Sequence, residues 1–235
     1  WCSIRPRGRS VRLLLTRWDQ GAGKIPELKV YGPPPIAKVT AALFQEGGAF
    51  WPDLVARTEH MCSVSIYHAR GGVGERKKPA PEVTEMKPNQ VIAGNGWTVK
   101  AVGVAHFGPQ LTSYGFRFDS PEGSFVYSGD SGPCVSMERL AEGADVMVHM
   151  CQYLTGTQLC EEFAESCMGH IELAKLGAKA KVKTLVISHV TEQIAHPGVR
   201  ERVVREMAEI YPGNIRIGVN MLEIPVRGTE QAKRV

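Results

Sequence analysis

Hydrophobic and polar residues alternate in two different ways along this chain, and the pattern changes after Gly129. Between residues 82 and 127 apolar positions recur about every second residue, which is the period of a β-strand. Two dipeptides in this stretch, Asn95-Gly96 and Glu122-Gly123, are typical of tight turns between strands. The pattern therefore predicts an antiparallel block of four strands, over residues 82–86, 97–105, 111–118 and 124–127.

After Gly129, short apolar runs alternate with stretches of helical spacing. Strands are predicted over residues 145–149 and 184–188 and, as one or two strands, over 215–225, with helices over 135–141, 171–180 and 199–210. The part before residue 82 is more mixed, with helical spacing over 36–44 and 51–64, a strand over 28–32, a short helix or buried strand over 13–16, and a loop over 71–81. The whole pattern predicts an α/β protein in which helices cover sheets.

Length and composition change this picture little. With 235 residues, of which 43% are apolar, one domain over residues 1–235 is expected. The net charge of +4 is spread along the chain, which indicates a solvated surface rather than a nucleic-acid patch. No apolar run approaches the ~18–20 residues of a membrane span, so we expect no membrane partner and a cytoplasmic location. The first residue is Trp1, which leaves a removed secretory signal open. The six cysteines form no Cys-x-x-Cys pair and are expected to be reduced.

Three side chains able to bind metal follow apolar strands directly. His106 follows the strand that ends near Ala105, Asp130 follows the run that ends at Gly129, and His189 follows residues 185–188. The ends of strands in α/β folds converge on one edge of a sheet, where ligand sites form. Two imidazoles and a carboxylate there suit zinc, manganese or iron(II). Taken one at a time, each residue has a simpler explanation, as a loop or core histidine or as an Asx-turn aspartate.

The sequences around these residues resemble motifs of a known family. The run FVYSGDSGPC, residues 125–134, resembles the Y-[ST]-G-D-[ST]-G-P signature of metallo-β-lactamase-fold hydrolases. Residues 143–149 resemble the ADxLxHE strand of the family, with Met150 in place of the usual Glu. Residues 169–174 and 183–189 resemble the GH-[ST]-x-x-A helix start and the VKxLVLTH strand of its ribonuclease Z and arylsulfatase-like branch, and residues 28–34 resemble the LxVYGP turn. The resemblance runs from about Val11 to Pro225.

The resemblance implies both a fold and a chemistry. The fold would be an αββα sandwich, and the reaction would be hydrolysis of a phosphodiester or related ester by a metal-bound hydroxide. His106 would bind the first of two divalent metals, expected to be zinc, and His189 the second, with Asp130 between them. His170 would steady the leaving group or the developing charge. His149 would lie in the core or support the ligands from behind.

One motif of the family is absent from the sequence. The H-x-H-x-D-H run supplies four of the family's metal ligands and should lie within the first dozen residues, but residues 1–10 read WCSIRPRGRS. The family's opening strands are missing as well, so we expect an N-terminally incomplete domain with weak metal binding and impaired turnover. A truncated or frame-shifted gene would explain this. So would a degenerate relative kept as a non-catalytic scaffold or binding protein.

Other partners and classes follow less directly. A small-molecule or nucleotide ester is the expected substrate, with RNA as an alternative and a homodimer as an open question for assembly. Residues 129–133 also resemble the GDSGGP loop of chymotrypsin-like proteases, with His106 as the partner histidine. That fold separates the two groups by roughly 100 residues and does not alternate helices with strands, so the protease interpretation is rejected.

Overall fold

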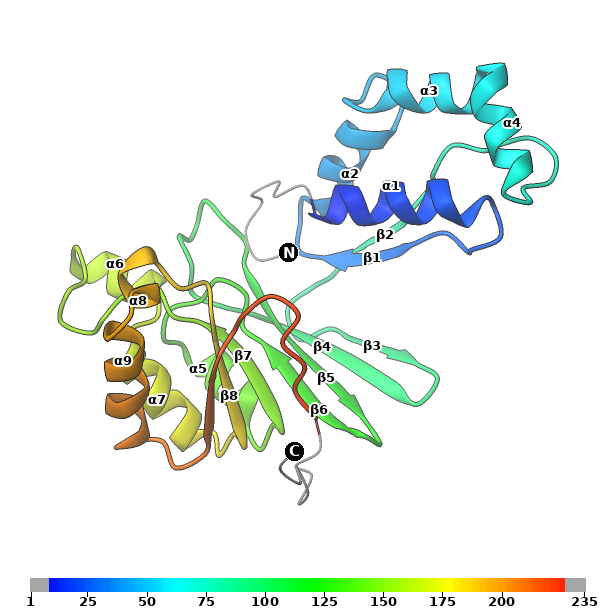
Figure 1. Ribbon diagram of the computed structural model, residues 1–235. Helices are drawn as coiled ribbons and strands as arrows, with labels where there is room; N and C mark the ends of the chain where they lie inside the picture. The colour runs from blue at the N-terminus through cyan, green and yellow to red at the C-terminus, as the bar shows by residue number, and fades with distance from the viewer. Residues whose placement is uncertain (1–8, 227–235) are drawn as a thin grey trace. The chain divides into compact units, whose positions relative to one another are not determined.

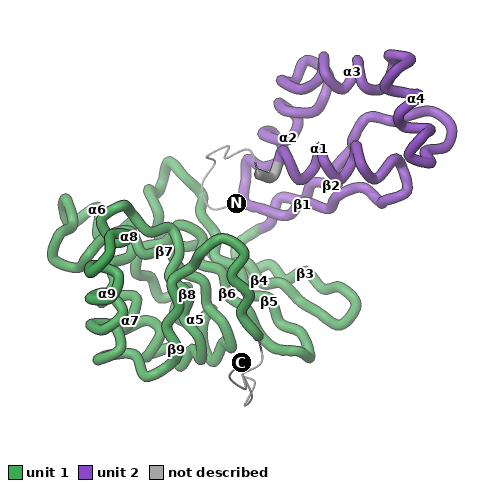
Figure 2. Tube along the Cα trace, in the orientation of Figure 1, with its two compact units in different colours: residues 1–3, 87–235 green, residues 4–86 purple. Residues whose placement is uncertain are grey.

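The structure is a computed structural model that describes residues 9–226. The described residues divide into two compact units (Figure 2): unit 1 contains residues 87–226, and unit 2 contains residues 9–86. Each unit has its own sheet and its own apolar cluster. The single domain expected over residues 1–235 stays a prediction. The atypical residues 1–10 fall almost entirely outside the described part of the chain.

Unit 1 is built on one seven-stranded sheet (Figure 1). Its strands lie in the order β3-β4-β5-β6-β7-β8-β9, antiparallel from β3 to β6 and parallel from β6 to β9. An antiparallel block followed by alternating strands and helices confirms the order predicted from the sequence. The strand predicted over residues 82–86 is not part of this block, because residues 82–85 pair in parallel with residues 29–32 in the separate sheet of unit 2. The elements are β3 (Val91–Gly94), β4 (Trp97–Gly103), β5 (Tyr114–Ser120), β6 (Gly123–Tyr127), α5 (Val135–Ala141), β7 (Val146–Met150), α6 (Glu161–Ser166), α7 (His170–Lys179), β8 (Thr184–Ser188), α8 (Glu192–Ala195), α9 (Val199–Ala208) and β9 (Asn214–Ile217).

The core of unit 1 lies between this sheet and its helices. Met147 and Leu185 point from the parallel strands into the same cluster as Leu173 of α7 and Met207 of α9, and all four are fully buried. Burying side chains of this size contributes about 1.5–3 kcal/mol each relative to leaving them exposed. The core therefore fixes the parallel strands, and with them the sheet edge at which those strands end.

Unit 2 is smaller and mostly helical. A two-stranded parallel sheet pairs Lys29 with Glu82 and Gly32 with Glu85. Leu14, Phe44 and Leu54 form its buried apolar cluster, which joins three of its helices. The elements are α1 (Arg9–Gly21), β1 (Lys29–Gly32), α2 (Ile36–Phe44), α3 (Trp51–Glu59), α4 (Met61–Ala69) and β2 (Glu82–Glu85).

Three further details differ from the sequence-based prediction. The helix expected over residues 51–64 is two helices, because His60 is extended and its Nδ1 accepts the Cys62 N–H, which begins α4. The turn at Asn95-Gly96 is present, since Gly94 pairs with Trp97 across it, but the strand before it, β3, was not predicted. The short helices α6 and α8 were not predicted either. In the part of the chain that the structure describes, no helix is long and apolar enough to cross a membrane.

Candidate functional site

The sheet of unit 1 brings three strand ends to one edge. β4 and β6 are both antiparallel to β5, and β6 and β8 are both parallel to β7, so β4, β6 and β8 run in the same direction. The residues that follow their carboxyl ends include His106, Asp130 and His189. The structure therefore brings together the three side chains that the sequence suggested as ligands, at the edge where sites form in such sheets.

The loop after β6 holds Asp130 in a tight backbone setting. Gly129 has a φ of 69°, in the left-handed region that glycine enters without strain. The Gly132 N–H donates to the Ala105 carbonyl at 2.7 Å, which ties this loop to the one that carries His106. A Cβ on Gly132 would lie 2.1 Å from the Glu165 carbonyl oxygen, so only glycine fits this approach. The G-D-S-G run thus has a local structural reason at each of its glycines.

Each of the two imidazoles faces a different oxygen of the Asp130 carboxylate. Nε2 of His106 lies 3.9 Å from Oδ2, and Nε2 of His189 lies 3.7 Å from Oδ1. Both distances are too long for hydrogen bonds. His189 has a φ of 52°, which is rare for a residue with a side chain and is found at sites where the surrounding structure enforces it. The carboxylate therefore stands between two imidazoles without bonding directly to either.

The orientation of His106 favours a free nitrogen toward the carboxylate. Its Nδ1 lies 2.8 Å from the Ser166 carbonyl oxygen, which accepts only from a protonated nitrogen. In the neutral ring the proton is thus on Nδ1, and the lone pair of Nε2 faces Asp130. A histidine ligand commonly donates its other ring N–H to a backbone carbonyl in this way. His106 and Asp130 are buried, while His189 is partly exposed.

The donor set does not complete a metal site. Within residues 9–226 no group of three or more His, Cys, Asp and Glu side chains is placed to hold one metal ion. A bridging Asp130 would give each of two ions one imidazole and one carboxylate oxygen, whereas zinc sites use three or four protein ligands. The residues present therefore fit part of a two-metal centre and not the whole of one.

His149 lies inside the core, on β7. Its Nδ1 is 2.8 Å from the Met150 carbonyl oxygen, and its Nε2 is buried with no protein partner. Burial lowers its pKa from 6.5 to about 4, against a smaller opposing effect of the hydrogen bond to Met150. At neutral pH the ring is uncharged. The side chain of Met150, where the family motif has Glu, places its sulfur 2.9 Å from the Ser131 nitrogen, next to Asp130.

His170 begins α7 and is bonded at both ring nitrogens. The Thr155 N–H donates to Nδ1 at 3.0 Å, and Nε2 lies 2.8 Å from Oε2 of Glu206 on α9. Glu206 was not among the residues suggested by the sequence. The sequence signal available for it was only its spacing from Arg202, four residues earlier on an amphipathic helix, which is typical of an ordinary surface ion pair.

The cysteines near the site are protonated thiols. Burial, together with the negative charge of Asp130, raises the pKa of Cys167 to about 11, and burial raises that of Cys151 to about 12. Neither is a thiolate at neutral pH. All five cysteines in the described residues are free, as expected from the sequence, and Cys2 lies outside that part.

A cavity in unit 2 involves different residues. Its volume is about 410 Å³, and its lining includes Arg17, Trp18, Tyr67 and Arg76. None of the five residues suggested as ligands or assistants lines it. This cavity is therefore separate from the residues that the sequence suggested.

Comparison with known proteins gives concordant matches. The family model of the beta-lactamase superfamily domain matches residues 53–190. Ribonuclease Z of Mycobacterium tuberculosis (strain H37Rv) is 28% identical over 220 residues, covering 91% of this chain and 75% of the relative. Ribonuclease Z of Mycobacterium sp. (strain KMS) is 27% identical over 219 residues, covering 91% of this chain and 71% of the relative.

Two solved structures are similar in fold. The metallo-β-lactamase-fold protein YhfI from Bacillus subtilis matches with a TM-score of 0.61 and 15% identity, over 92% of this chain and 72% of that one. The short form of human tRNase Z matches with a TM-score of 0.56 and 13% identity, over the same shares of the two chains. At this level of sequence identity, the two structures support a shared fold and nothing more specific.

Proposed function

We propose that this chain, which belongs to the beta-lactamase superfamily, has the framework of a metal-dependent phosphodiester hydrolase and carries one part of its two-metal centre. The observation that carries the proposal is the carboxylate of Asp130, which stands between Nε2 of His106 at 3.9 Å and Nε2 of His189 at 3.7 Å. We call these three residues the Asp130 cluster. Each side of the carboxylate offers one oxygen and one nitrogen ligand to a cation.

The electrostatics of the Asp130 cluster support a cation between its members. An Nε2 lone pair and a carboxylate oxygen at this distance repel each other unless a proton or a metal ion lies between them. The bond from His106 to the Ser166 carbonyl keeps the proton of the neutral ring on the far nitrogen. A buried carboxylate with no cation beside it is costly, so the cluster is better suited to a metal ion than to an empty state.

The cluster alone does not support ordinary turnover. A metal ion of this kind would lower the pKa of bound water toward ~7, but that chemistry needs a stable centre with three or more protein ligands per ion. Two ligands per ion fall short of this, so no reaction step is assigned to the cluster by itself. We propose that metal binding by this chain is weak and that its hydrolytic rate is low.

The substrate class is proposed from the relatives. The two similar proteins named above are ribonuclease Z, so a phosphodiester in RNA is the first substrate to test, ahead of small nucleotide esters. His170 is proposed to belong to the site, held there by bonds at both of its ring nitrogens. His149 is proposed to support the site from the core, as an uncharged side chain on β7.

A second function is favoured by the incomplete donor set. A chain that holds too few ligands for catalysis retains a folded surface that can bind a partner or an RNA without cleaving it. RNA binding through phosphate contacts would weaken steeply as salt is raised. The scaffold alternative therefore predicts salt-dependent RNA binding with no cleavage under any metal condition.

A phosphodiesterase assay with added metal separates the two functions. The assay measures hydrolysis of bis(4-nitrophenyl) phosphate and of a structured RNA, with zinc or manganese in excess. The hydrolase proposal predicts slow, metal-dependent cleavage that Asp130→Asn reduces to the rate without protein. His196→Gln is the matched control, because His196 is an exposed histidine seven positions after His189, at the end of α8, and does not face Asp130.

Two results would contradict the hydrolase proposal. Absence of cleavage at every metal concentration would leave the scaffold as the better account. Metal-dependent cleavage that is the same in Asp130→Asn as in the original chain would show that the reaction occurs elsewhere. A turnover number of 1–10³ s⁻¹, roughly the usual range for enzymes, would instead show that the metal centre is complete.

A further inference from the structure

His170 is the most completely bonded histidine in the part of the chain that the structure describes, and one of its partners comes from a distant helix. We propose that Glu206 on α9 is a positioning residue that, together with the Thr155 N–H, holds the imidazole of His170 in a single orientation. This inference rests on the proposed function, in which His170 belongs to the proposed site. Glu206 contacts neither the Asp130 cluster nor, under this proposal, the substrate.

The two hydrogen bonds of His170 determine where its proton lies. The Thr155 backbone N–H donates to Nδ1 at 3.0 Å, so Nδ1 must carry a lone pair. The proton of the neutral ring is then on Nε2, which donates to Oε2 of Glu206 at 2.8 Å. A ring with one acceptor and one donor bond cannot flip without losing both. The tautomer is therefore set by named partners on both sides.

Glu206 is itself held in place. Nε of Arg202 donates to its Oε1 at 2.6 Å, so each oxygen of the carboxylate has its own partner. Hydrogen bonds from Arg202 and then from His170 lower the pKa of Glu206 below its ordinary value. It is ionised at neutral pH, and a charged acceptor makes the bond to His170 stronger than a neutral one would.

Burial separates this arrangement from an ordinary surface ion pair. Arg202 and Glu206 are four residues apart on an exposed helix face, and such pairs by themselves contribute little. The side chain of His170, in contrast, is only 2% exposed. Without Glu206 its Nε2–H would be a buried donor with no acceptor, which folded proteins avoid. The main structural role of the Glu206 carboxylate is therefore to accept the buried Nε2–H of His170, and not to form the surface pair with Arg202.

The same group of bonds reaches the loop that follows β7. Oγ1 of Thr155 donates to Oε2 of Glu172 at 2.6 Å and accepts the Ile171 N–H at 3.2 Å. The loop is thus bonded to the first turn of α7 at three points, one of which is the His170 ring. Both ring nitrogens of His170 are thus bonded within unit 1, one to the loop after β7 and one to α9.

The test is the NMR signature of the His170 ring. The chain is labelled with ¹⁵N-histidine, and the ring signals of His170 are identified by their loss in His170→Gln. We expect the original chain to show a neutral ring with the proton on Nε2 and a downfield Nε2–H resonance that exchanges slowly with water. In Glu206→Leu this resonance should disappear into exchange with water, while the Thr155 N–H still keeps the proton off Nδ1.

Two variants make the result specific. Glu209→Leu is the matched control, because Glu209 is exposed at the end of the same helix, and it should leave the His170 signals unchanged. Glu206→Gln keeps an acceptor oxygen without the charge, so it should retain the Nε2–H resonance at a position upfield of the original. If the leucine variant fails to fold, the upfield shift in Glu206→Gln decides the question.

The proposal is overturned if folded Glu206→Leu keeps the original Nε2–H resonance, or if Glu206→Gln leaves that resonance unshifted. The measurement uses neither metal nor substrate. Failure of the phosphodiesterase assay would therefore count against the proposed function and leave the NMR result standing. A changed NMR signature with no hydrolytic activity would keep Glu206 as the residue that positions His170 while removing the hydrolase.

Discussion

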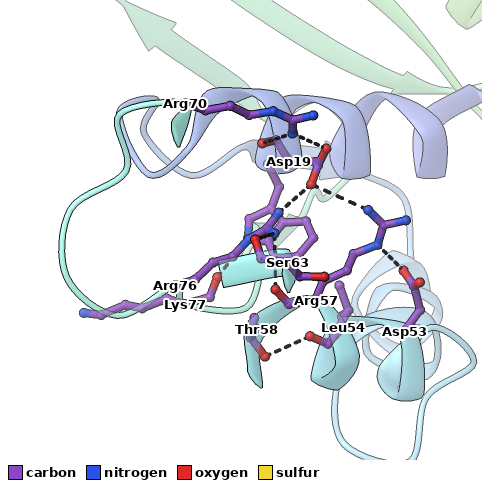
Figure 3. Close-up of polar contacts among 10 residues, drawn as sticks. Asp19, Asp53, Leu54, Arg57, Thr58, Ser63, Arg70, Arg76 and Lys77 are labelled. Carbon is purple, nitrogen blue, oxygen red and sulfur yellow. Dashed lines mark hydrogen bonds and ion pairs between the residues drawn. The ribbon is translucent and has the colours of Figure 1, made fainter. Parts of the chain in front are cut away.

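The two units of this molecule are stabilised by different kinds of contact. Unit 1 has an extensive apolar core between a seven-stranded sheet and its helices, with Met147, Leu185 and Met207 fully buried. Unit 2 has a small apolar cluster and a network of charged groups around Asp19 (Figure 3). The same chain therefore contains one unit that depends on burial and another that also depends on one carboxylate. Perturbations chosen for each type of contact should affect the two units differently.

The charged network of unit 2 joins the Asp19 carboxylate to three arginines, and one of them, Arg76, is buried. The Arg76 side chain is only 4% exposed, bonds to Oδ1 of Asp19 at 2.5 Å and lies over the Trp18 ring, with Cζ 4.4 Å from its centroid. Arg70 bonds to the other oxygen of Asp19 at 2.7 Å, and Arg57 lies 3.6 Å from Oδ1. Figure 3 shows these side chains converging on Asp19. One carboxylate thus connects α1, α3, the end of α4 and the loop before β2.

The largest effect is expected from Arg76→Ala. The substitution removes a buried guanidinium with its bond to Asp19 and its contact with Trp18. Breaking a buried ion pair costs about 3–5 kcal/mol, and we expect the lower end here because Asp19 keeps Arg70 and Arg57 as partners. Amides of α1, α3 and α4 should lose hydrogen-exchange protection, while those of β7 and β8 keep theirs. Lys77→Ala is the matched control, because Lys77 is the exposed neighbour. Unchanged protection in unit 2 would show that its apolar cluster is sufficient without the network.

A core substitution in unit 1 should have the converse effect. Leu185→Ala on β8 removes a fully buried side chain, which costs about 3 kcal/mol in a well-packed core. Protection should fall in β7, β8 and α7 and remain in unit 2. Substitution of the exposed Leu159 by alanine serves as the control, since it leaves no cavity. Equal losses in both units would mean that they unfold as one cooperative body.

The two units should also differ in their response to acid. The folded pKa of His149 is about 4, below the 6.5 of the unperturbed group, so the unfolded chain binds more protons between these values. Unit 1 should therefore lose stability as pH falls from about 6.5, by roughly 2 kcal/mol at pH 5. His149→Leu should remove this part of the pH dependence. Identical pH profiles for the original chain and the variant would contradict a buried neutral imidazole.

Acid should weaken unit 2 only at lower pH. Burial alone would raise the pKa of Asp19, but hydrogen bonds and charges from Arg70 and Arg76 outweigh it and lower the pKa below 3.8. A lowered carboxylate pKa stabilises the fold above the unfolded value, and the stabilisation is lost as pH falls below it. Unit 1 is thus expected to respond first and unit 2 later as pH is lowered.

The smallest effect is expected from an exposed ion pair of unit 1. Lys179 bonds to Glu138 at 2.6 Å, but its side chain is 68% exposed, and pairs of this kind contribute about 0.2–1 kcal/mol. A double-mutant cycle with Lys179→Ala and Glu138→Ala, read by urea unfolding, measures the coupling directly. A coupling energy close to the stability loss expected for Arg76→Ala would contradict this contrast, because exposed and buried ion pairs would then contribute equally to stability.

The residues at the strand ends were predicted well from the sequence, whereas contacts between elements distant in the sequence were not. His106, Asp130 and His189 were identified because each follows an apolar strand, and parallel strands share an edge whatever packs around them. The break at His60 and the strand β3 depend on local capping and on pairing with a neighbour, which period counting does not detect. Glu206 reaches His170 across 36 positions, so only the packing of α9 on α7 reveals the pair.

The central claim is that the Asp130 cluster is an incomplete metal centre, and the metal content of the purified chain tests it most directly. Plasma mass spectrometry after dialysis against metal-free buffer should find much less than one zinc, manganese or iron per chain. Added zinc should bind weakly to the original chain and should not bind measurably to Asp130→Asn. Close to two tightly held metals per chain, lost in Asp130→Asn, would contradict the claim and show that the centre is complete.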